Sequence, residues 1–157
     1  MFVGGNGGFD AIRKKYEAMK KNLNQKILRN LEYIAEDVLN DARRKGSYTD
    51  RTGNLRSSIG CRIYFNGNPV RSYAVQLVGT PTEPERRLSL EELQSNFNDA
   101  MEQYAAEHIA DVEGYTIVLV AGMNYAYYVE AKGYNVLHES NVLLQRRIEE
   151  LKNSLFK

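Results

Sequence analysis

The chain contains few of the residues from which most catalytic and metal sites are built. Its 157 residues include one cysteine, Cys61, and two histidines, His108 and His138. A single cysteine cannot form an internal disulfide, and Cys61 lies in an alternating apolar run where a thiol usually packs as a small hydrophobe. No two of these residues have the spacing of zinc ligands. We therefore expect neither a metal site nor a cofactor.

Signals for export and for membrane insertion are also missing from the sequence. The segment Met1–Asp10 is rich in glycine but has neither the basic start nor the apolar stretch of a signal peptide. No segment approaches the roughly 20 apolar residues that span a bilayer. We expect a protein that is synthesised in a cytoplasm, is not exported and has no membrane partner.

The glycines near the N-terminus resemble a phosphate-binding loop only in composition. No strand is predicted before Gly4–Gly8, and no Gly-Lys-Ser or Gly-Lys-Thr follows it, so the backbone cradle for a phosphate is missing. We interpret residues 1–9 as a flexible glycine-rich arm that becomes ordered when it meets a neighbour. Residues 10–157 are expected to form one domain, because a chain of this length buries a single core.

The charge of the chain is balanced overall but unevenly distributed. The net charge is +1, which is not the strongly basic balance of a protein whose main partner is nucleic acid. The segment Ala11–Lys45 holds ten Lys or Arg against five Asp or Glu, whereas Thr82–Glu113 holds two against nine. Two solvated faces would explain this pattern, and so would surfaces of opposite charge that meet between neighbouring subunits.

One apolar stripe runs through the N-terminal part of the chain. Its members recur at steps of three and four residues and are Phe9, Ile12, Tyr16, Met19, Leu23, Ile27, Leu31, Ile34, Val38 and Ala42. This spacing predicts a helix from about Asp10 to Lys45, with Gly46 in the left-handed stop position. Such a helix is roughly 50 Å long and exceeds what a domain of this size covers. Part of the stripe is therefore expected to find its partner on another subunit.

The middle of the chain predicts strands around a tight turn. Ile59–Phe65 and Val70–Val78 have the composition of two strands, and Asn66-Gly67 between them tolerates positive φ. The nearly continuous apolar run Gly114–Ala121 predicts a central strand, and Tyr125–Glu130 is expected to extend or follow it as another strand.

Two further helices complete a predicted α+β fold. Ser89 and Glu92 offer a capping box for a helix over Leu90–Ala110, and residues 82–113 are interpreted as an acidic helical insertion. Asn141 is expected to cap a C-terminal helix whose Leu144, Ile148, Leu151 and Leu155 share one face.

The connection between the first helix and the first strand carries its own capping groups. Asp50 and Thr52 can accept hydrogen bonds from backbone N–H groups, and Gly53 permits a positive φ. Leu55 and Ile59 are expected to point inward. Arg56 is expected to bind a carboxylate. On its own this segment is typical of an ordinary structural connection.

A second segment, Asn124–Leu137, is crowded with aromatic residues. Such crowding is found in platforms that stack nucleotide bases, but few Lys or Arg residues flank this segment. Core and interface packing therefore explain the aromatics better.

The two segments, in this order and between a long helix and a final helix, resemble the head–tail joining and tail-completion proteins of tailed bacteriophages. The matching positions of the first element are Asp50, Thr52, Gly53, Leu55, Arg56, Ser58 and Ile59, and those of the second are Tyr125, Ala126, Tyr128, Val129, Glu130 and Gly133. The resemblance covers most of the chain but leaves residues 82–113 unaccounted for.

The resemblance implies a non-enzymatic virion protein of a phage or prophage. It implies a long N-terminal helix packed on a small, mainly antiparallel sheet, and assembly in the bacterial host cytoplasm as a homo-oligomeric ring. The implied partners are other copies of the chain and other neck or tail proteins, with DNA touched only in passage.

Two other functions remain open at this point. A nucleic-acid-binding module would use the basic N-terminal helix, and its affinity would fall steeply with salt. A small hydrolase would use Glu130 and His138, and a pocket that contains both side chains would support it.

Overall fold

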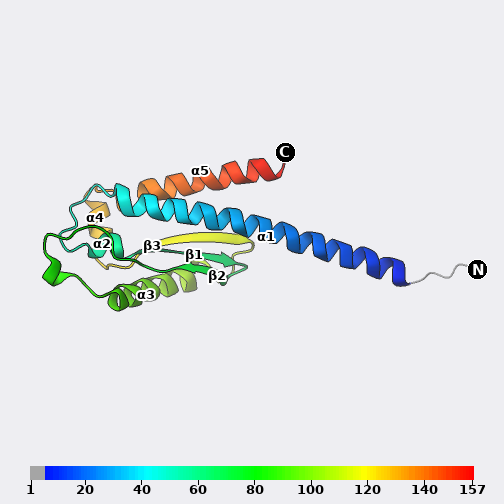
Figure 1. Ribbon diagram of the computed structural model, residues 1–157, viewed down its shortest axis with the longest axis horizontal. Coiled ribbons are helices and arrows are strands. Elements are labelled where there is room, and N and C mark those ends of the chain that lie inside the picture. Colours follow the sequence, from blue (N-terminus) through cyan, green and yellow to red (C-terminus); the bar gives the residue numbers. More distant parts are fainter. Residues whose placement is uncertain (1–5) are drawn as a thin grey trace, which may run out of the picture.

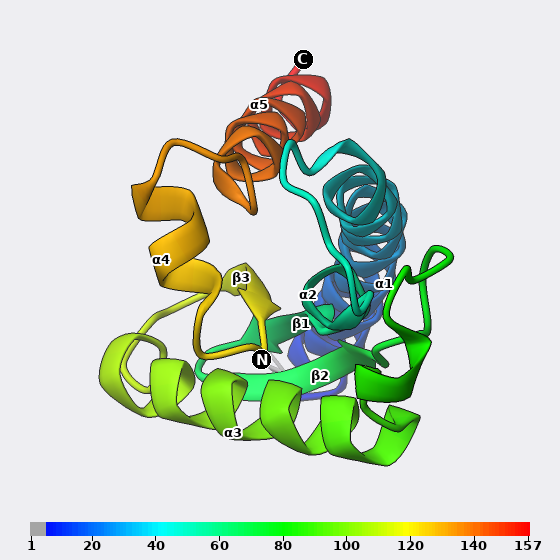
Figure 2. The same cartoon turned by 90° about the vertical axis from the view of Figure 1, so that its left-hand side faces the viewer.

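The computed structural model describes residues 6–157 and confirms an α+β fold in which a long helix, a three-stranded sheet and a C-terminal helix are packed together (Figure 1). The elements in chain order are α1 (Asn6–Lys45), α2 (Asn54–Ser57), β1 (Ile59–Phe65), β2 (Asn68–Tyr73), the 3-10 turn η1 (Pro84–Arg86), α3 (Leu90–His108), β3 (Tyr115–Ala121), α4 (Ala126–Ala131) and α5 (His138–Leu155). Both strand pairs are antiparallel, and the strand order is β2-β1-β3. Helices α1 and α5 lie on one side of the sheet and α3 on the other (Figure 2).

The core forms two layers because successive residues of β1 point to opposite faces of the sheet. Ile59, Cys61 and Ile63 are fully buried and pack with Leu31 and Leu39 of α1. The burial of Cys61 agrees with its predicted role as a small hydrophobe, and it raises the pKa of the thiol to about 12.

The opposite face of the sheet packs on α3. Tyr64 and Val118 contact the fully buried Leu93, Phe97 and Met101 of that helix. The helix predicted within residues 82–113 therefore supplies one of the two core layers, although its exposed surface is acidic.

Several local predictions are confirmed by the structure. Asn66 and Gly67 both have positive φ, at 48° and 78°, in the turn between β1 and β2. Ser89 and Glu92 form the predicted capping box, in which Glu92 N–H donates to the Ser89 hydroxyl at 3.2 Å and Ser89 N–H donates to the Glu92 carboxylate at 2.8 Å. These signals depend on a few neighbouring residues, which is why the sequence alone reveals them.

The prediction of β3 as a central strand is wrong. It lies at the edge of the sheet, and β1 is the central strand. Residues of β3 are apolar on both faces because α1 covers one face and α3 the other, with Ile117 and Leu119 on the α1 side and Val118 on the α3 side. Burial on two faces produces a continuous apolar run at an edge as well as at the centre.

The segment Tyr125–Glu130 is not a strand, which corrects a second prediction. It is mostly the short helix α4, and the N–H of Val129 donates to the carbonyl of Tyr125 at 3.2 Å. Tyr125 and Val129 are partly buried four residues apart, while Tyr127 and Tyr128 between them are exposed. That spacing is helical and not alternating.

The bounds of three other elements differ from the predictions. Helix α1 begins at Asn6, so residues 6–9 of the predicted flexible arm are helical, and residues 1–5 lie outside the described part of the chain. Strand β2 ends at Tyr73 instead of Val78, and the N–H of Val75 donates to the Gln94 side chain at 3.1 Å instead of to a strand. Helix α5 begins at His138, before the predicted cap Asn141.

The first half of α1 extends beyond the rest of the molecule (Figure 1). A helix of 40 residues is about 60 Å long. The expectation that this helix exceeds its own domain is therefore confirmed. Over residues 6–157 no helix combines the length and apolar composition needed to cross a bilayer.

Candidate functional site

The two sequence elements that carry the phage resemblance meet at the end of the molecule opposite the N-terminus. Leu55 of the first element is buried in a cluster with Tyr48 and Val136, against which Tyr125 and Val129 of the second element pack. Helices α2 and α4 bring them together beside the C-terminal end of α1 (Figure 1). This junction, formed by residues 46–59 and 124–138, is the candidate site.

The turn of the first element has the predicted capping geometry. Gly53 has a φ of 73°, a conformation that residues with a Cβ atom rarely adopt. The carboxylate of Asp50 accepts a hydrogen bond from the Arg56 N–H at 2.9 Å, and the Thr52 hydroxyl accepts one from the Asn54 N–H at 3.2 Å. These bonds satisfy donors at the start of α2, as expected of residues that initiate a helix.

Arg56 binds backbone carbonyls and not a carboxylate, which corrects its predicted role. Its Nη1 donates to the carbonyls of Arg43 and Arg44 at 3.0 and 3.1 Å, and its Nη2 to those of Gly46 and Tyr48 at 2.7 and 3.3 Å. The last carbonyls of a helix have no partner within it, so a guanidinium with several donors can satisfy them together. Arg56 is therefore the C-terminal cap of α1.

The structural role of Gly46 also differs from the prediction. Its φ is not in the left-handed region, so it does not end α1 in that way. A Cβ atom at this position would lie 2.4 Å from the ring of Tyr48, so glycine allows the ring to approach the helix end. The ring of Tyr48 also lies 4.8 Å from the Arg56 guanidinium carbon, within cation–π range.

The remaining residues of the first element fix the start of the sheet. Ser58 is fully buried and its hydroxyl donates to the Leu55 carbonyl at 2.8 Å. Ile59 is fully buried, as predicted, and its carbonyl accepts hydrogen bonds from the side chain of Arg43 at 3.2 and 2.9 Å. Burial lowers the pKa of Arg43. Thus α1 and β1 are linked at the same point by packing and by hydrogen bonds.

Asn54 and Ser57, which no pattern in the sequence marks, attach the loop after β2 to this junction. The Asn54 amide donates to the Arg86 carbonyl at 3.1 Å and accepts from the Leu88 N–H at 2.9 Å. The Ser57 hydroxyl accepts from the Val78 N–H at 2.9 Å. Both residues are buried, and their partners lie more than 20 residues away, so no local pattern indicates them.

The second element presents one face to the junction and one to solvent. Burial raises the pKa of Tyr125, the nearby Asp50 raises it further, and a hydrogen bond with Thr52 opposes them. Ala126 and Val129 are partly buried, whereas Tyr128 is 68% exposed and Tyr127 76% exposed. The aromatic residues are therefore divided between packing and an exposed pair.

Glu130 connects α4 to α5. Its Oε1 accepts hydrogen bonds from the N–H groups of Leu137 and His138, at 3.1 and 2.8 Å, at the first turn of α5. The chain turns between the two helices at Gly133, which has a φ of 88°. Glu130 is thus an N-terminal cap supplied from another helix.

Glu130 and His138 line one pocket, which is the condition set for the hydrolase hypothesis. The pocket has a volume of about 370 Å³, and its other walls include Ile117, Leu119 and Leu144. The proximity of Glu130 and His138 is explained without catalysis. The Oε1 atom of Glu130 already accepts two backbone hydrogen bonds, one of them from the N–H of His138. Among the described residues, no group of three or more His, Cys, Asp or Glu side chains is arranged to hold a metal ion.

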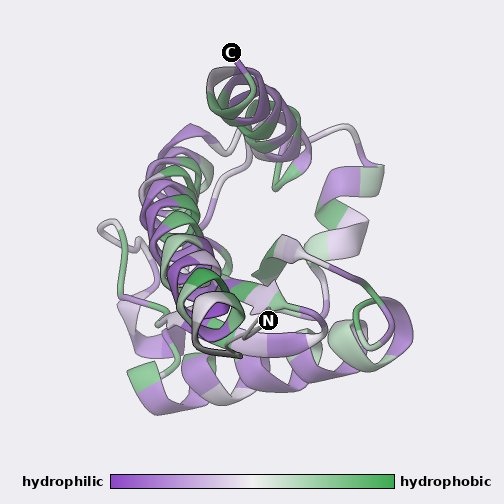
Figure 3. Ribbon diagram, turned by 90° about the vertical axis from the view of Figure 1, so that its right-hand side faces the viewer, coloured by the Kyte–Doolittle hydropathy of each residue, from purple (hydrophilic) through white to green (hydrophobic). Residues whose placement is uncertain are grey.

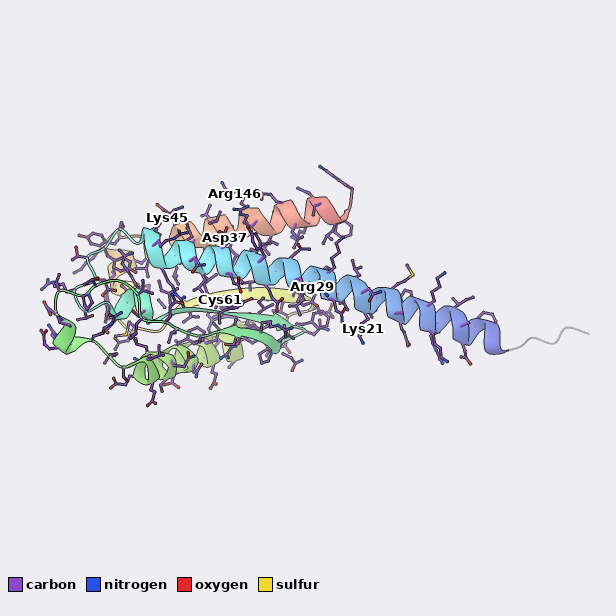
Figure 4. All side chains as sticks on the ribbon, in the orientation of Figure 1. Lys21, Arg29, Asp37, Lys45, Cys61 and Arg146 are labelled. Carbon is purple, nitrogen blue, oxygen red and sulfur yellow. The ribbon has the colours of Figure 1, made fainter. Side chains whose placement is uncertain are left out.

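A second surface lies on the projecting half of α1, which we define as Gly8–Lys26. Its apolar stripe is exposed, from 80% at Phe9 to 51% at Leu23. Figure 3 shows that hydrophobic and hydrophilic residues alternate along this end of the helix, and Figure 4 shows Lys21 on the part that extends past the sheet. The stripe continues into the buried residues Leu31 and Val38, so one apolar face is covered at one end and uncovered at the other.

An apolar groove lies between α5 and the edge strand β3. It has a volume of about 620 Å³, and its floor is formed by Ile27 and Leu31 of α1. Its main apolar walls are Tyr115, Ile117, Leu144, Ile148, Leu151 and Leu155. We refer to it as the α5–β3 groove.

In comparisons with protein-family models, with curated proteins and with solved structures, the chain matches none of them.

Proposed function

We propose that the chain is a structural virion protein of a tailed phage or prophage, acting in head–tail joining or tail completion as the subunit of an oligomeric ring. The observation that carries this proposal is that the elements with the phage resemblance pack into one junction that holds a helix whose projecting half leaves its apolar stripe uncovered. A ring subunit must hold the surfaces that contact its neighbours in a fixed arrangement, and this junction sets the direction of α1 relative to the rest of the subunit.

The polar groups of the junction support a structural role in preference to catalysis. Asp50, Arg56 and Glu130 all bind backbone groups that would otherwise be unsatisfied at helix ends. A catalytic acid, base or nucleophile must instead direct its functional atom at a substrate. These side chains determine how α1, α4 and α5 meet.

Deletion of the gene from its phage tests the proposal. We expect heads and tails to be synthesised but not joined, or tails to end abnormally, when lysates are viewed by electron microscopy. A plasmid copy of the unaltered gene should restore joined particles, which controls for effects on neighbouring genes. Normal infectious particles from the deletion strain would refute the assignment.

A nucleic-acid-binding function is the alternative that a specific observation favours. The projecting half of α1 holds six Lys or Arg against two Asp or Glu, and these side chains are exposed. Duplex binding that persists near 0.15 M salt, and falls with the steep salt dependence of phosphate contacts, would support this alternative. A ring subunit should show little duplex binding under those conditions.

A further inference from the structure

The hydrogen bonds at the two ends of β3 show which of its residues bond to β1. Just before the strand, the Asn66 N–H donates to the Gly114 carbonyl at 2.9 Å. Just after it, the Gly122 N–H donates to the Ser58 carbonyl at 3.1 Å. The pairing of β1 with β3 has no register shift between these two bonds. In such an antiparallel pair, residues that exchange hydrogen bonds alternate with residues that do not.

This alternation leaves half of the β3 backbone without a partner in the sheet. Counted from Gly114, the residues that bond to β1 are Thr116, Val118 and Val120. The N–H and C=O groups of the residues between them point away from β1, and these residues are Tyr115, Ile117, Leu119 and Ala121. Within residues 6–157 no other backbone group bonds to them. The outer edge of β3 is therefore open.

The two edges of the sheet differ in how they are protected. Natural edge strands avoid unwanted pairing through charged side chains, prolines and bulges. Strand β2 contains Pro69 and Arg71, and its pairing with β1 shifts register. Strand β3, with the sequence Tyr-Thr-Ile-Val-Leu-Val-Ala, has none of these features. An open apolar edge of this kind is a template for another strand.

The open edge lies at the bottom of the pocket of about 370 Å³, which we call the edge slot. Four consecutive residues of β3, 116–119, line the slot. Tyr104 and Ile109, near the C-terminal end of α3, line it on one side, and Asn141 and Leu144 of α5 line it on the other. Because α3 and α5 lie on opposite faces of the sheet (Figure 2), the slot has the position of a fourth strand.

We propose that the edge slot binds an extended segment of another protein, which adds to β3 as a fourth strand. The backbone N–H and C=O groups of the segment bond to those of Ile117 and Leu119. A helix cannot bind in this way, because its backbone groups bond to one another. This inference goes beyond the proposed function, since it depends only on β3 and its surroundings.

The walls of the slot determine which side chains the segment carries. Opposed residues of two paired strands project to the same face. A residue that bonds to Ile117 therefore projects toward α5, where it meets the apolar side chains of Leu144 and Ile148. Among the described residues on the slot walls, Glu130 is the one carboxylate, and no Lys or Arg is present. We expect an uncharged segment that is apolar at the residues whose backbone faces β3.

The strands of a second copy do not fit the slot. Strand β1 is paired on both sides, and β2 has the protected edge. Strand β3 of a second copy is flanked by its own α3 and α5, and these helices would meet the flanking helices of the first copy. The occupant is therefore a single extended segment that carries no helices beside it.

Hydrogen exchange of the purified protein, followed by NMR, tests whether the edge is open. We expect the amides of Ile117 and Leu119 to exchange at least about tenfold faster than those of Thr116 and Val118, which bond to β1. Equal protection of both sets at every concentration would contradict the proposal. Protection of Ile117 and Leu119 that grows with protein concentration would show that a second copy covers the edge, which would also overturn it.

A labelled peptide of alternating residues, Val-Thr-Val-Thr-Val-Thr-Val, tests the mode of binding. N-methylation removes a backbone donor, and the apolar wall requires the valines to be the residues that face β3. We expect N-methylation of the internal valines to weaken binding at least about tenfold, and N-methylation of the threonines to change it less than about twofold. Binding should slow the exchange of the Ile117 and Leu119 amides.

The controls separate strand addition from other contacts. Equal binding of the two methylated peptides, or no binding of the unmodified peptide up to about 1 mM, would refute the proposal. Leu119→Pro removes one outward donor but no bond to β1, so it should abolish peptide binding if circular dichroism shows a folded protein. If this variant does not fold, the methylated peptides with the parent protein decide the question. Neither measurement involves phage particles, so the result is independent of the proposed function.

Discussion

Replacing Arg56 should destabilise the fold more than its partly exposed position suggests. Its guanidinium donates to four backbone carbonyls, two in the last turn of α1 and two just beyond it, at distances from 2.7 to 3.3 Å. A hydrogen bond to a charged group contributes about 1.5–3 kcal/mol, but water can replace part of this set when the side chain is removed. We therefore expect Arg56→Ala to lower the free energy of unfolding by about 2–4 kcal/mol.

The variant Arg56→Lys separates the effect of the positive charge from the effect of the guanidinium geometry. Arg56→Lys keeps the positive charge near the helix end, but one ammonium group cannot reproduce the planar fork that reaches the carbonyls of Arg43 and Gly46 together. We expect about half the loss of the alanine variant, roughly 1–2 kcal/mol. Equal stability of the lysine variant and the parent protein would show that charge alone is sufficient.

Urea denaturation followed by circular dichroism measures these differences. Arg51→Ala is the matched control, because its side chain is 70% exposed and its only ion pair in the described structure is a surface contact with Glu83 at 3.5 Å. It should change the free energy of unfolding by less than about 0.5 kcal/mol. If Arg56→Ala is no more destabilising than Arg51→Ala, the capping role of Arg56 is wrong.

Three further predictions concern the same junction. Gly53→Val should destabilise the fold by about 1–3 kcal/mol because residue 53 has positive φ, and a thermal melt equal to that of the parent would contradict this. Glu130→Ala should cost about 0.5–2 kcal/mol in urea denaturation, whereas Glu130→Gln keeps an acceptor oxygen and should cost less than half as much. Burial raises the pKa of Tyr48 to about 12 from 10.0, so the unfolded chain releases this proton first and stability should fall as the pH rises from 10.0 to about 12. In pH-dependent melts Tyr48→Phe should reduce that fall, and an unchanged slope would show that other groups cause it.

Local signals in the sequence predicted the parts of the fold that depend on neighbouring residues. The stripe of α1, the Asn66-Gly67 turn and the capping box of α3 each depend on residues that follow one another at a spacing of four positions or fewer. Gly53 belongs to the same class, because its positive φ is a property of a short turn. Such features can be predicted without knowing what packs against them.

Features determined by distant contacts were not predictable in the same way. The strand order depends on which helices cover each face of the sheet, and two covered faces make β3 apolar at an edge. Arg56 was expected to bind a carboxylate because residue types suggest ion pairs, but it binds carbonyls at and just beyond the C-terminal end of α1, 8 to 13 residues earlier in the chain. Asn54 binds residues 86 and 88, a separation that no local pattern encodes.

We propose above that the chain is a structural component at the junction of head and tail. Gold labelling of a C-terminally tagged copy in purified particles tests it most directly, because the C-terminal end of α5 is exposed and lies away from the junction of α2 and α4 (Figure 1). We expect label at the head–tail junction or the head-proximal end of the tail. Particles that carry no label, while the tagged protein remains entirely in the unassembled fraction of the lysate, would contradict it.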